Sequence, residues 1–401
     1  MRDKCSSISS SSSSSSCCIG PTGPRGFPGR KGLRGNNGPT GPIGDTGAGG
    51  SFCQQFEESG LDVGDIVTFG KDNAINPELH ELIVERWHWN ASIDSTGPDT
   101  NPAIVTDKCG NIYVVGSGAN GVPPGFFDAG NIGGANLFGH TGINNEVYIG
   151  KINSDGQWLW TAAVDSDSDD TLPKVATDHC GNVYVVGQAN GTPLFYNADD
   201  TQTISGKTLN DTTQVFVGKI NPDGVWQWAA AIDETSSTPG QVITPDIATD
   251  SCGNVYVVAQ GVVITDEEGN ATVHFYDALT TTGSTNPVSS LDGKSASSNY
   301  ICIGKIDRNG IWVWAAQIDT ASTSGALDPV VATDCSGNAY IAGWGADTDP
   351  PLYYGPNSTG NVDSTVILTG RANGTATHTQ IFLGKIDPLG LWLWSASIGD
   401  L

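Results

Sequence analysis

The sequence of 401 residues is poor in basic side chains: 18 lysines and arginines stand against 43 aspartates and glutamates, which gives a formal net charge of −25. Six of the basic residues fall within the first fifty positions, so the rest of the chain is more acidic still. A surface of this charge repels phosphate backbones. We therefore expect no nucleic-acid binding by the main part of the chain.

Long apolar stretches are also missing. There is no run of about 18 apolar residues, the length that a bilayer span needs. The N-terminus, MRDKCSSISSSSSSSSCC, carries a serine tract where an export signal needs about 7 to 15 apolar residues. We expect no membrane span and no secretory signal peptide. A protein at an outer surface would then reach it by assembly into a particle or by another export route.

Recognisable catalytic motifs are absent as well. The six histidines form no metal-spaced pair, and the sequence contains no G-x-S-x-G, H-E-x-x-H or phosphate-loop motif. This favours a protein that is not an enzyme. A hydrolase or lyase acting on polysaccharide is the alternative, because two carboxylates on different loops would leave no local signature.

What is present begins with glycine at every third position from Gly20 to Gly50. Three polyproline-II chains wound around a common axis require this period, whereas a flexible linker would lose phase within a few triplets. We predict a collagen-like stalk at residues 20–50 that makes the protein a homotrimer, preceded by a disordered Ser/Cys-rich leader at residues 1–19. Interchain disulfides at Cys17, Cys18 and Cys53 would fix the register of the chains; the alternative is free thiols in a flexible tail.

A longer repeat fills the rest of the chain, and two signatures alternate in it. One is an aspartate turn followed by Gly-Asn-x-Tyr, and the other is Gly-Lys-Ile followed by Trp-x-Trp. Each is typical of a hairpin in which Asp or Asn accepts backbone N–H groups and glycine supplies a positive φ. The first signature covers residues 106–116, 177–187, 249–259 and 333–343, and the second covers residues 150–165, 218–233, 304–319 and 384–400.

These signatures indicate four strands per unit: one ends at Thr-Asp, and the next three run through Gly-Asn-x-Tyr, Gly-Lys-Ile and Trp-x-Trp. The units recur at intervals of 71, 72 and 84 residues between Gly110, Gly181, Gly253 and Gly337. Such units are typical of a β-propeller. We predict an all-β fold: a β-propeller repeat domain of four complete units at residues 87–401, after a connector with first strands at residues 51–86. A fifth Trp-x-Trp pair, Trp87 and Trp89, precedes the first complete unit. Together with residues 65–72 it could form a partial fifth blade, so the sequence does not decide between four and five blades.

The pattern D-x-x-G-N-x-Y-V-x-G, followed by G-K-I-[DN]-x-x-G-x-W, resembles a bacterial β-propeller repeat found in large surface and secreted proteins. The Gly-x-y segment resembles short collagen-like proteins of bacterial spore coats and giant-virus particles. Together these resemblances imply a stalk joined to a propeller head on a virion, a spore coat or another extracellular surface. They are specific for the fold and say little about activity.

Long insertions interrupt every unit at the same point, at residues 117–146, 188–214, 260–300 and 344–380. Insertions at one place of each repeat project from one side of the fold, which is the side that such folds use for binding. Each insertion carries two adjacent aromatic residues that would either form a shared binding rim or anchor the loop: Phe126 and Phe127, Phe195 and Tyr196, Phe275 and Tyr276, and Tyr353 and Tyr354.

One acidic cluster, VDSDSDD at residues 164–170, offers Asp165, Asp167 and Asp169 at alternating positions. Their carboxylates would supply oxygen ligands for a calcium ion. The cluster lacks the glycine and the distal glutamate of a helix-loop-helix calcium site, so a solvated acidic loop is the alternative. We expect no other cofactor.

The sequence thus predicts a structural and recognition protein in which a trimeric stalk displays propeller heads on a particle or cell surface, for adhesion or assembly. Three heads on one stalk would raise the apparent affinity for a surface glycan or protein receptor through multivalency.

Overall fold

The computed structural model describes the chain from Trp89 to Ile398, apart from gaps at residues 119–120, 132, 143, 209–212, 236–240, 263–271, 280–288, 295, 297–298, 320–325, 347–349 and 373–378. The leader (residues 1–19), the collagen-like stalk (20–50) and the connector (51–86) lie outside the described residues. So do Cys17, Cys18 and Cys53, and the predictions made for all of these stay predictions.

The described residues form 25 strands and no helix. The fold is all-β and of the β-propeller type, as predicted, because four antiparallel strands follow one another in chain order across the sheet of each unit. The first strands of units 1 to 4 are β2 (Thr100–Thr106), β8 (Thr171–Thr177), β14 (Gln241–Thr249) and β20 (Ala326–Thr333), and the second strands are β3 (Ile112–Gly118), β9 (Val183–Ala189), β15 (Val255–Val262) and β21 (Ala339–Ala346). The third strands are β6 (Glu146–Ile152), β12 (Gln214–Ile220), β18 (Tyr300–Ile306) and β24 (Thr379–Ile386), and the fourth, which carry Trp-x-Trp, are β7 (Trp158–Asp165), β13 (Trp226–Thr235), β19 (Trp312–Asp319) and β25 (Trp392–Ile398).

The turn between the first two strands of each unit depends on its aspartate. In unit 1, Asp107 Oδ1 accepts hydrogen bonds from the backbone N–H groups of Cys109 and Asn111, at 2.8 and 2.9 Å. Gly110 supplies the positive φ, at 83°. This confirms the predicted turn. The hydroxyl group of Tyr113, on β3, also donates a hydrogen bond to Asp107 Oδ2 at 3.0 Å.

The four insertions also contain strands, which the sequence did not reveal. Each insertion forms a hairpin. In units 2 to 4 the first strand of the hairpin pairs with the Trp-x-Trp strand of the preceding unit. The sequence predicted loops that project from one side of the fold. Instead, the hairpins of units 2 to 4 form the last two strands in the sheet of the preceding unit. Their strands are β4 (Gly125–Phe127) with β5 (Leu137–Phe138), β10 (Leu194–Tyr196) with β11 (Gln202–Ser205), β16 (Thr272–Leu279) with β17 (Leu291–Asp292), and β22 (Leu352–Pro356) with β23 (Val362–Thr369).

The first hairpin shows that a partial fifth sheet precedes unit 1. Its strand β4 pairs with β1 (Ser92–Asp94), a short strand that follows Trp89. The strands β1, β4 and β5 form a three-stranded sheet of their own. The described residues thus hold four complete units and part of another, and residues 65–72 lie outside them.

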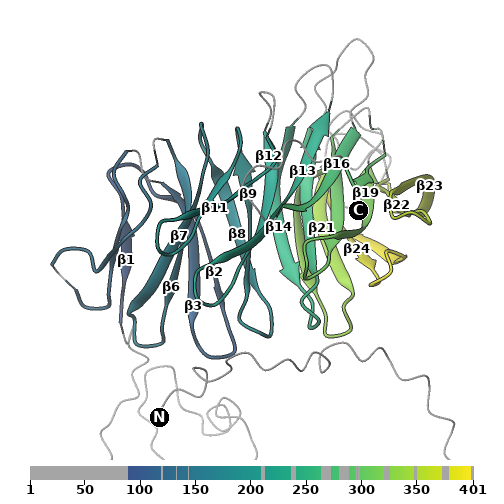
Figure 1. The fold of residues 1–401 in the computed structure, drawn as a ribbon. Coiled ribbons are helices and arrows are strands. Elements are labelled where there is room, and N and C mark those ends of the chain that lie inside the picture. The colour runs from purple at the N-terminus through teal and green to yellow at the C-terminus, as the bar shows by residue number, and fades with distance from the viewer. Residues whose placement is uncertain are drawn as a thin grey trace, which may run out of the picture. The chain divides into compact units, whose positions relative to one another are not determined.

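Consecutive units are joined along their first strands. β2 packs on β8, β8 on β14, and β14 on β20, and Figure 1 shows the units following one another in chain order. At one end of these strands, Thr177 Oγ1 donates to the Thr106 carbonyl at 3.0 Å, and Thr249 and Thr333 repeat the bond to the preceding unit. Each unit is therefore bonded to the next at a fixed register.

The Trp-x-Trp motif serves packing within and between units. The first tryptophan lies edge-on to the first aromatic residue of the unit's own hairpin, as Trp226 does to Phe195 with ring centroids 5.0 Å apart. In units 1 to 3 the second tryptophan donates Nε1–H to a turn carbonyl of the following unit, as Trp160 does to Pro222 at 2.9 Å. This explains why both tryptophans recur in every unit.

The described residues contain no helix of the length and hydropathy that a membrane crossing requires.

Cys302, on β18, should resist thiol reagents until the protein unfolds. Its side chain is fully buried, and burial raises the pKa of the thiol to about 12. The thiolate is the reactive form, so native labelling at pH 8 should be at least about 100-fold slower than at the exposed Cys335. Peptide mapping after timed alkylation measures both rates. Comparable rates at the two cysteines would contradict the burial of Cys302.

Candidate metal centre

A glycine followed by a basic residue comes after the second strand of every hairpin. The glycine N–H donates to a carbonyl at the start of the same hairpin, as Gly206 does to Pro193 at 2.7 Å. This bond closes the hairpin and places the basic residue near the end of the unit's Trp-x-Trp strand. The basic residues are His140, Lys207, Lys294 and Arg371.

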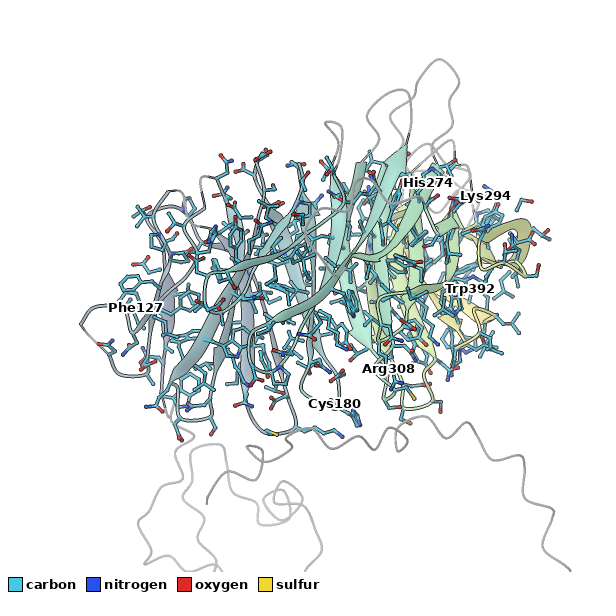
Figure 2. All side chains as sticks on the ribbon, in the orientation of Figure 1. Phe127, Cys180, His274, Lys294, Arg308 and Trp392 are labelled. Carbon is cyan, nitrogen blue, oxygen red and sulfur yellow. The ribbon has the colours of Figure 1, made fainter. Side chains whose placement is uncertain are left out.

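In units 2 and 3 the basic residue forms an ion pair with the aspartate near the end of that strand. Lys207 Nζ lies 2.5 Å from Asp233 Oδ2, and both side chains are buried. Lys294 Nζ lies 2.7 Å from Asp319 Oδ2. Figure 2 shows Lys294 at the end of the strands opposite the turns that carry Cys180 and Arg308. A lysine ammonium thus neutralises a carboxylate at the same place in two units.

Removing Lys207 should cost unit 2 much of its stability. The variant Lys207→Met leaves Asp233 buried without its counter-ion, and breaking a buried pair in this way costs about 3–5 kcal/mol. Urea denaturation followed by tryptophan fluorescence measures the loss. The double variant Lys207→Met/Asp233→Leu removes both charges and should recover most of it. A double variant as unstable as the single one would show that the pairing of charge is not the cause.

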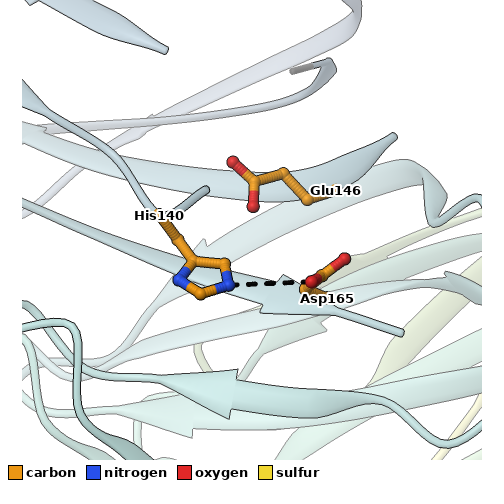
Figure 3. A group of neighbouring side chains, drawn as sticks. All are labelled: His140, Glu146 and Asp165. Atoms are coloured by element: carbon orange, nitrogen blue, oxygen red, sulfur yellow. Dashed lines mark ion pairs between the residues drawn. The ribbon is translucent and has the colours of Figure 1, made fainter. Parts of the chain in front are cut away.

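Unit 1 carries different residues at the same positions. His140 replaces the lysine, and Glu146 stands four residues before Gly150 of Gly-Lys-Ile, where unit 2 has Gln214 before Gly218. His140 Nε2 lies 3.6 Å from Asp165 Oδ2. One ligand atom from each of His140, Glu146 and Asp165 lies within 4.8 Å of the other two. Figure 3 shows the three side chains directed toward one another from the hairpin end, β6 and β7.

The imidazole of His140 is held in one orientation by residues from the hairpin of unit 2. Its Nδ1 lies 2.5 Å from Asp200 Oδ1, and its ring stacks on Tyr196 with centroids 3.6 Å apart. Burial disfavours the charged ring, but the contacts with Asp165 and Asp200 raise its pKa above the ordinary value. The Nδ1 contact leaves Nε2 facing Asp165.

Glu146 is the unusual member of the cluster. Its side chain is 0% exposed, and among the described residues neither carboxyl oxygen has a hydrogen-bond partner. Burial first, and then the charges of Asp165, Asp200 and Asp170, raise its pKa to about 9. The Gly142 N–H lies nearby and lowers the pKa in part, but it does not reach the geometry of a hydrogen bond. At the same position in unit 2, Gln214 donates Nε2–H groups to the Gly191 and Lys207 carbonyls at 2.7 and 3.0 Å, and its Oε1 alone lacks a partner among the described residues. A glutamate has no N–H to donate.

Asp170 adds to the buried negative charge near this cluster. Its side chain is fully buried, Oδ1 accepts a hydrogen bond from Ser166 Oγ at 2.9 Å, and Oδ2 has no partner in the described part of the chain. Burial raises its pKa to about 8. Buried carboxyl groups without partners are costly, so the site requires either protons or a cation.

The residues predicted for calcium divide between two places. Asp165 belongs to the cluster with His140 and Glu146. Asp167 and Asp169 are exposed and lie outside that set; Asp169 Oδ1 accepts the Asn145 N–H at 3.1 Å, and the Asp167 carbonyl accepts from Asn144 Nδ2 at 2.9 Å. Alignment of the units against one another would have singled out His140 and Glu146, because the other units have lysine or arginine, and glutamine or tyrosine, there.

The aromatic pairs of the insertions contact protein. The first residues, Phe126, Phe195, Phe275 and Tyr353, are fully buried beside tryptophans, so they anchor the hairpins and offer no ring to a ligand. Tyr276 and Tyr354 are nearly buried beneath Lys207 and Lys294, at 4.5 and 4.6 Å. Phe127 and Tyr196 keep part of their surface, and a binding role for them stays a prediction.

These features define a repeat protein of the β-propeller type with a candidate metal centre in its first unit. No family model matches the sequence. Over 185 residues, 42% of this chain, the sequence is 26% identical to an uncharacterized WD repeat-containing protein of Acanthamoeba polyphaga mimivirus. The match spans only 13% of the length of that relative. It fits the repeat character of the chain.

Two solved structures are similar to this chain only at low TM-scores. One is a protein of unknown function from Bacteroides caccae, with 14% identity, 63% of this chain and 90% of that chain covered, and a TM-score of 0.17. The other is the GH43 protein BlXynB from Bacillus licheniformis, with 10% identity, 77% and 78% covered, and a TM-score of 0.18.

Proposed function

We propose that this chain is a non-enzymatic structural and recognition protein, in which a collagen-like segment at residues 20–50 trimerises and displays propeller-type heads on a particle or cell surface. The observation that carries the proposal is that the same side-chain contacts join one unit to the next along the chain. Tryptophan, lysine, aspartate and tyrosine side chains recur at equivalent positions, and they contact the next unit or their own hairpin.

The buried position of Glu146 supports the non-enzymatic part of the proposal. A carboxyl group with a raised pKa beside another carboxylate is typical of acid–base catalysis. A catalytic acid, however, must lie within hydrogen-bond reach of its substrate, and Glu146 is closed off from solvent. The polysaccharide hydrolase or lyase alternative therefore gains no support from this cluster.

The particle surface as the location rests on the resemblance of the Gly-x-y segment to collagen-like proteins of spore coats and giant-virus particles. The Gly-x-y period supports the trimer. Adhesion and receptor binding follow from multivalent display rather than from a described pocket.

The trimer is tested on the full-length chain by analytical ultracentrifugation and circular dichroism. We expect a trimer and a triple-helical melting transition. Gly35→Asp places a side chain at the crowded axis and should abolish both, whereas Asn36→Asp adds the same charge at a neighbouring position and should abolish neither. Monomers in the unmodified protein would refute the stalk.

Recognition is tested separately on a glycan array, with a reducing-sugar assay on the bound glycans. Binding without sugar release supports the proposal, and sugar release supports the enzymatic alternative. Immunogold labelling of particles and cells tests the location.

A further inference from the structure

We propose that unit 1 binds one divalent transition-metal ion of the zinc class, through His140 Nε2 and the carboxylates of Glu146 and Asp165. The metal would connect β6 and β7 to the end of the unit's own hairpin, and through His140 to the hairpin of unit 2. This inference does not depend on the display function, and it shares only Asp165 with the predicted calcium site.

The other units show what the position requires. In units 2 and 3 a lysine ammonium lies against the aspartate at the end of the Trp-x-Trp strand. In unit 1 the ammonium is missing, because His140 takes its place, while Glu146 adds a second carboxyl group. A permanently charged ammonium has been replaced by an imidazole, and a carboxyl group has been added at one buried place. A metal ion would supply the charge that lysine supplies elsewhere.

Glu146 points to a ligand independently of the charge count. It is fully buried, is directed into the cluster (Figure 3), and has no hydrogen-bond partner for either oxygen among the described residues. One oxygen of Asp165 is buried and unpartnered as well. Buried carboxyl oxygens are normally hydrogen-bonded. Oxygens of both Glu146 and Asp165 lack partners at the same place, and one cation bound between them would satisfy both.

His140 has the arrangement of a metal-binding histidine. Its Nδ1 contacts the Asp200 carboxylate at 2.5 Å, so in the neutral imidazole Nδ1 carries the hydrogen and Nε2 offers its electron pair to a metal. A carboxylate behind the imidazole is the usual second contact of a metal-ligating histidine. The stacked ring of Tyr196 restricts rotation of the imidazole further.

The ligand types select the class of ion. An imidazole nitrogen with two carboxylates suits zinc and its first-row neighbours, whereas calcium and magnesium prefer oxygen ligands alone. Zinc ligands lie about 2.0–2.2 Å from the ion, so the three atoms, now within 4.8 Å of one another, need to approach by only small side-chain rotations.

The test compares the full-length protein with a variant that copies unit 2 into unit 1. His140→Lys/Glu146→Gln restores the lysine–aspartate pair and the glutamine amide, so it should fold. After chelator treatment, both proteins are dialysed against zinc and their bound metal is counted. Because cysteines elsewhere in the chain also bind zinc, the readout is the difference: we expect the unmodified protein to hold one zinc ion more per chain. At zinc 100-fold above the Kd of this site, the melting temperature of the unmodified protein should rise by about 5 °C more than that of the variant.

Two further variants keep the result decisive. Glu146→Gln alone preserves the shape of the side chain and should weaken zinc binding at least about 100-fold. Lys207→His/Gln214→Glu transfers the set of unit 1 to unit 2 and should add a zinc ion. Equal zinc content in the unmodified protein and in both unit 1 variants would overturn the proposal. Calcium binding that these variants abolish, with no zinc difference, would overturn the choice of metal.

Discussion

Replacing Gly218 with alanine should destabilise unit 2 by about 3 kcal/mol. Gly218 lies on β12, and a Cβ built there would fall 2.5 Å from Trp226 Cζ3 and 2.9 Å from Phe195 Cε1. Both rings belong to the core and pack edge to face, so neither can move without opening a gap elsewhere. The shift of the urea midpoint, with the slope of the transition unchanged, measures the loss.

Gly110→Ala provides the matched control. Gly110 lies in the turn of unit 1 at φ 83°, and nothing lies within 4 Å of an added Cβ. The cost there comes only from the left-handed backbone and should be about 1 kcal/mol. If Gly218→Ala lowered the free energy of unfolding as little as Gly110→Ala, the close packing of Trp226 over Gly218 would be refuted.

Truncating the second tryptophan of Trp-x-Trp should lower the free energy of unfolding far more in unit 3, which is followed by another unit, than in unit 4. Trp314 of unit 3 is 3% exposed and donates Nε1–H to the Pro388 carbonyl of unit 4 at 3.0 Å. Trp314→Ala removes this bond and a large buried ring, so it should cost about 3–5 kcal/mol. Guanidinium or urea titration with far-ultraviolet circular dichroism measures the free energy of unfolding.

Trp394 of unit 4 occupies the equivalent position but is 39% exposed, and among the described residues no carbonyl accepts its Nε1–H. It packs on Tyr340 with centroids 6.1 Å apart, much as Trp314 packs on Tyr256 at 6.0 Å. Trp394→Ala should therefore cost about 2 kcal/mol or less. Equal losses for the two variants would mean that contact with the following unit contributes little.

Most of the strand order followed from the sequence. The Asp-x-x-Gly-Asn turn acts within five residues, through the Asp107 carboxylate and the positive φ of Gly110, so its pattern specifies the hairpin wherever it occurs. Tryptophans two residues apart share one face of a strand, which identified the fourth strand of each unit. The partial sheet before unit 1 was indicated by Trp87 and Trp89, together with residues 65–72, which lie outside the described residues.

The site was recovered only in part. Asp165 was singled out because it stands in an acidic run, but Asp167 and Asp169 of the same run face solvent. His140 and Glu146 carry no local motif. Their significance appears only beside the lysine and glutamine of unit 2, and their convergence depends on a hairpin that closes through the Gly139 N–H and the Pro124 carbonyl.

Local chemistry in the sequence by itself determined the repeat, its four strands, its turns and the all-β fold, because turn formation and side-chain alternation act between near neighbours in the chain. The tertiary structure decided which sheet each hairpin joins and which charges meet. Edge pairing between units and the contact of His140 with Asp200, 60 residues away, depend on free energy gained only when distant strands pack. For that reason the candidate metal centre belongs to the folded arrangement of units rather than to any one segment.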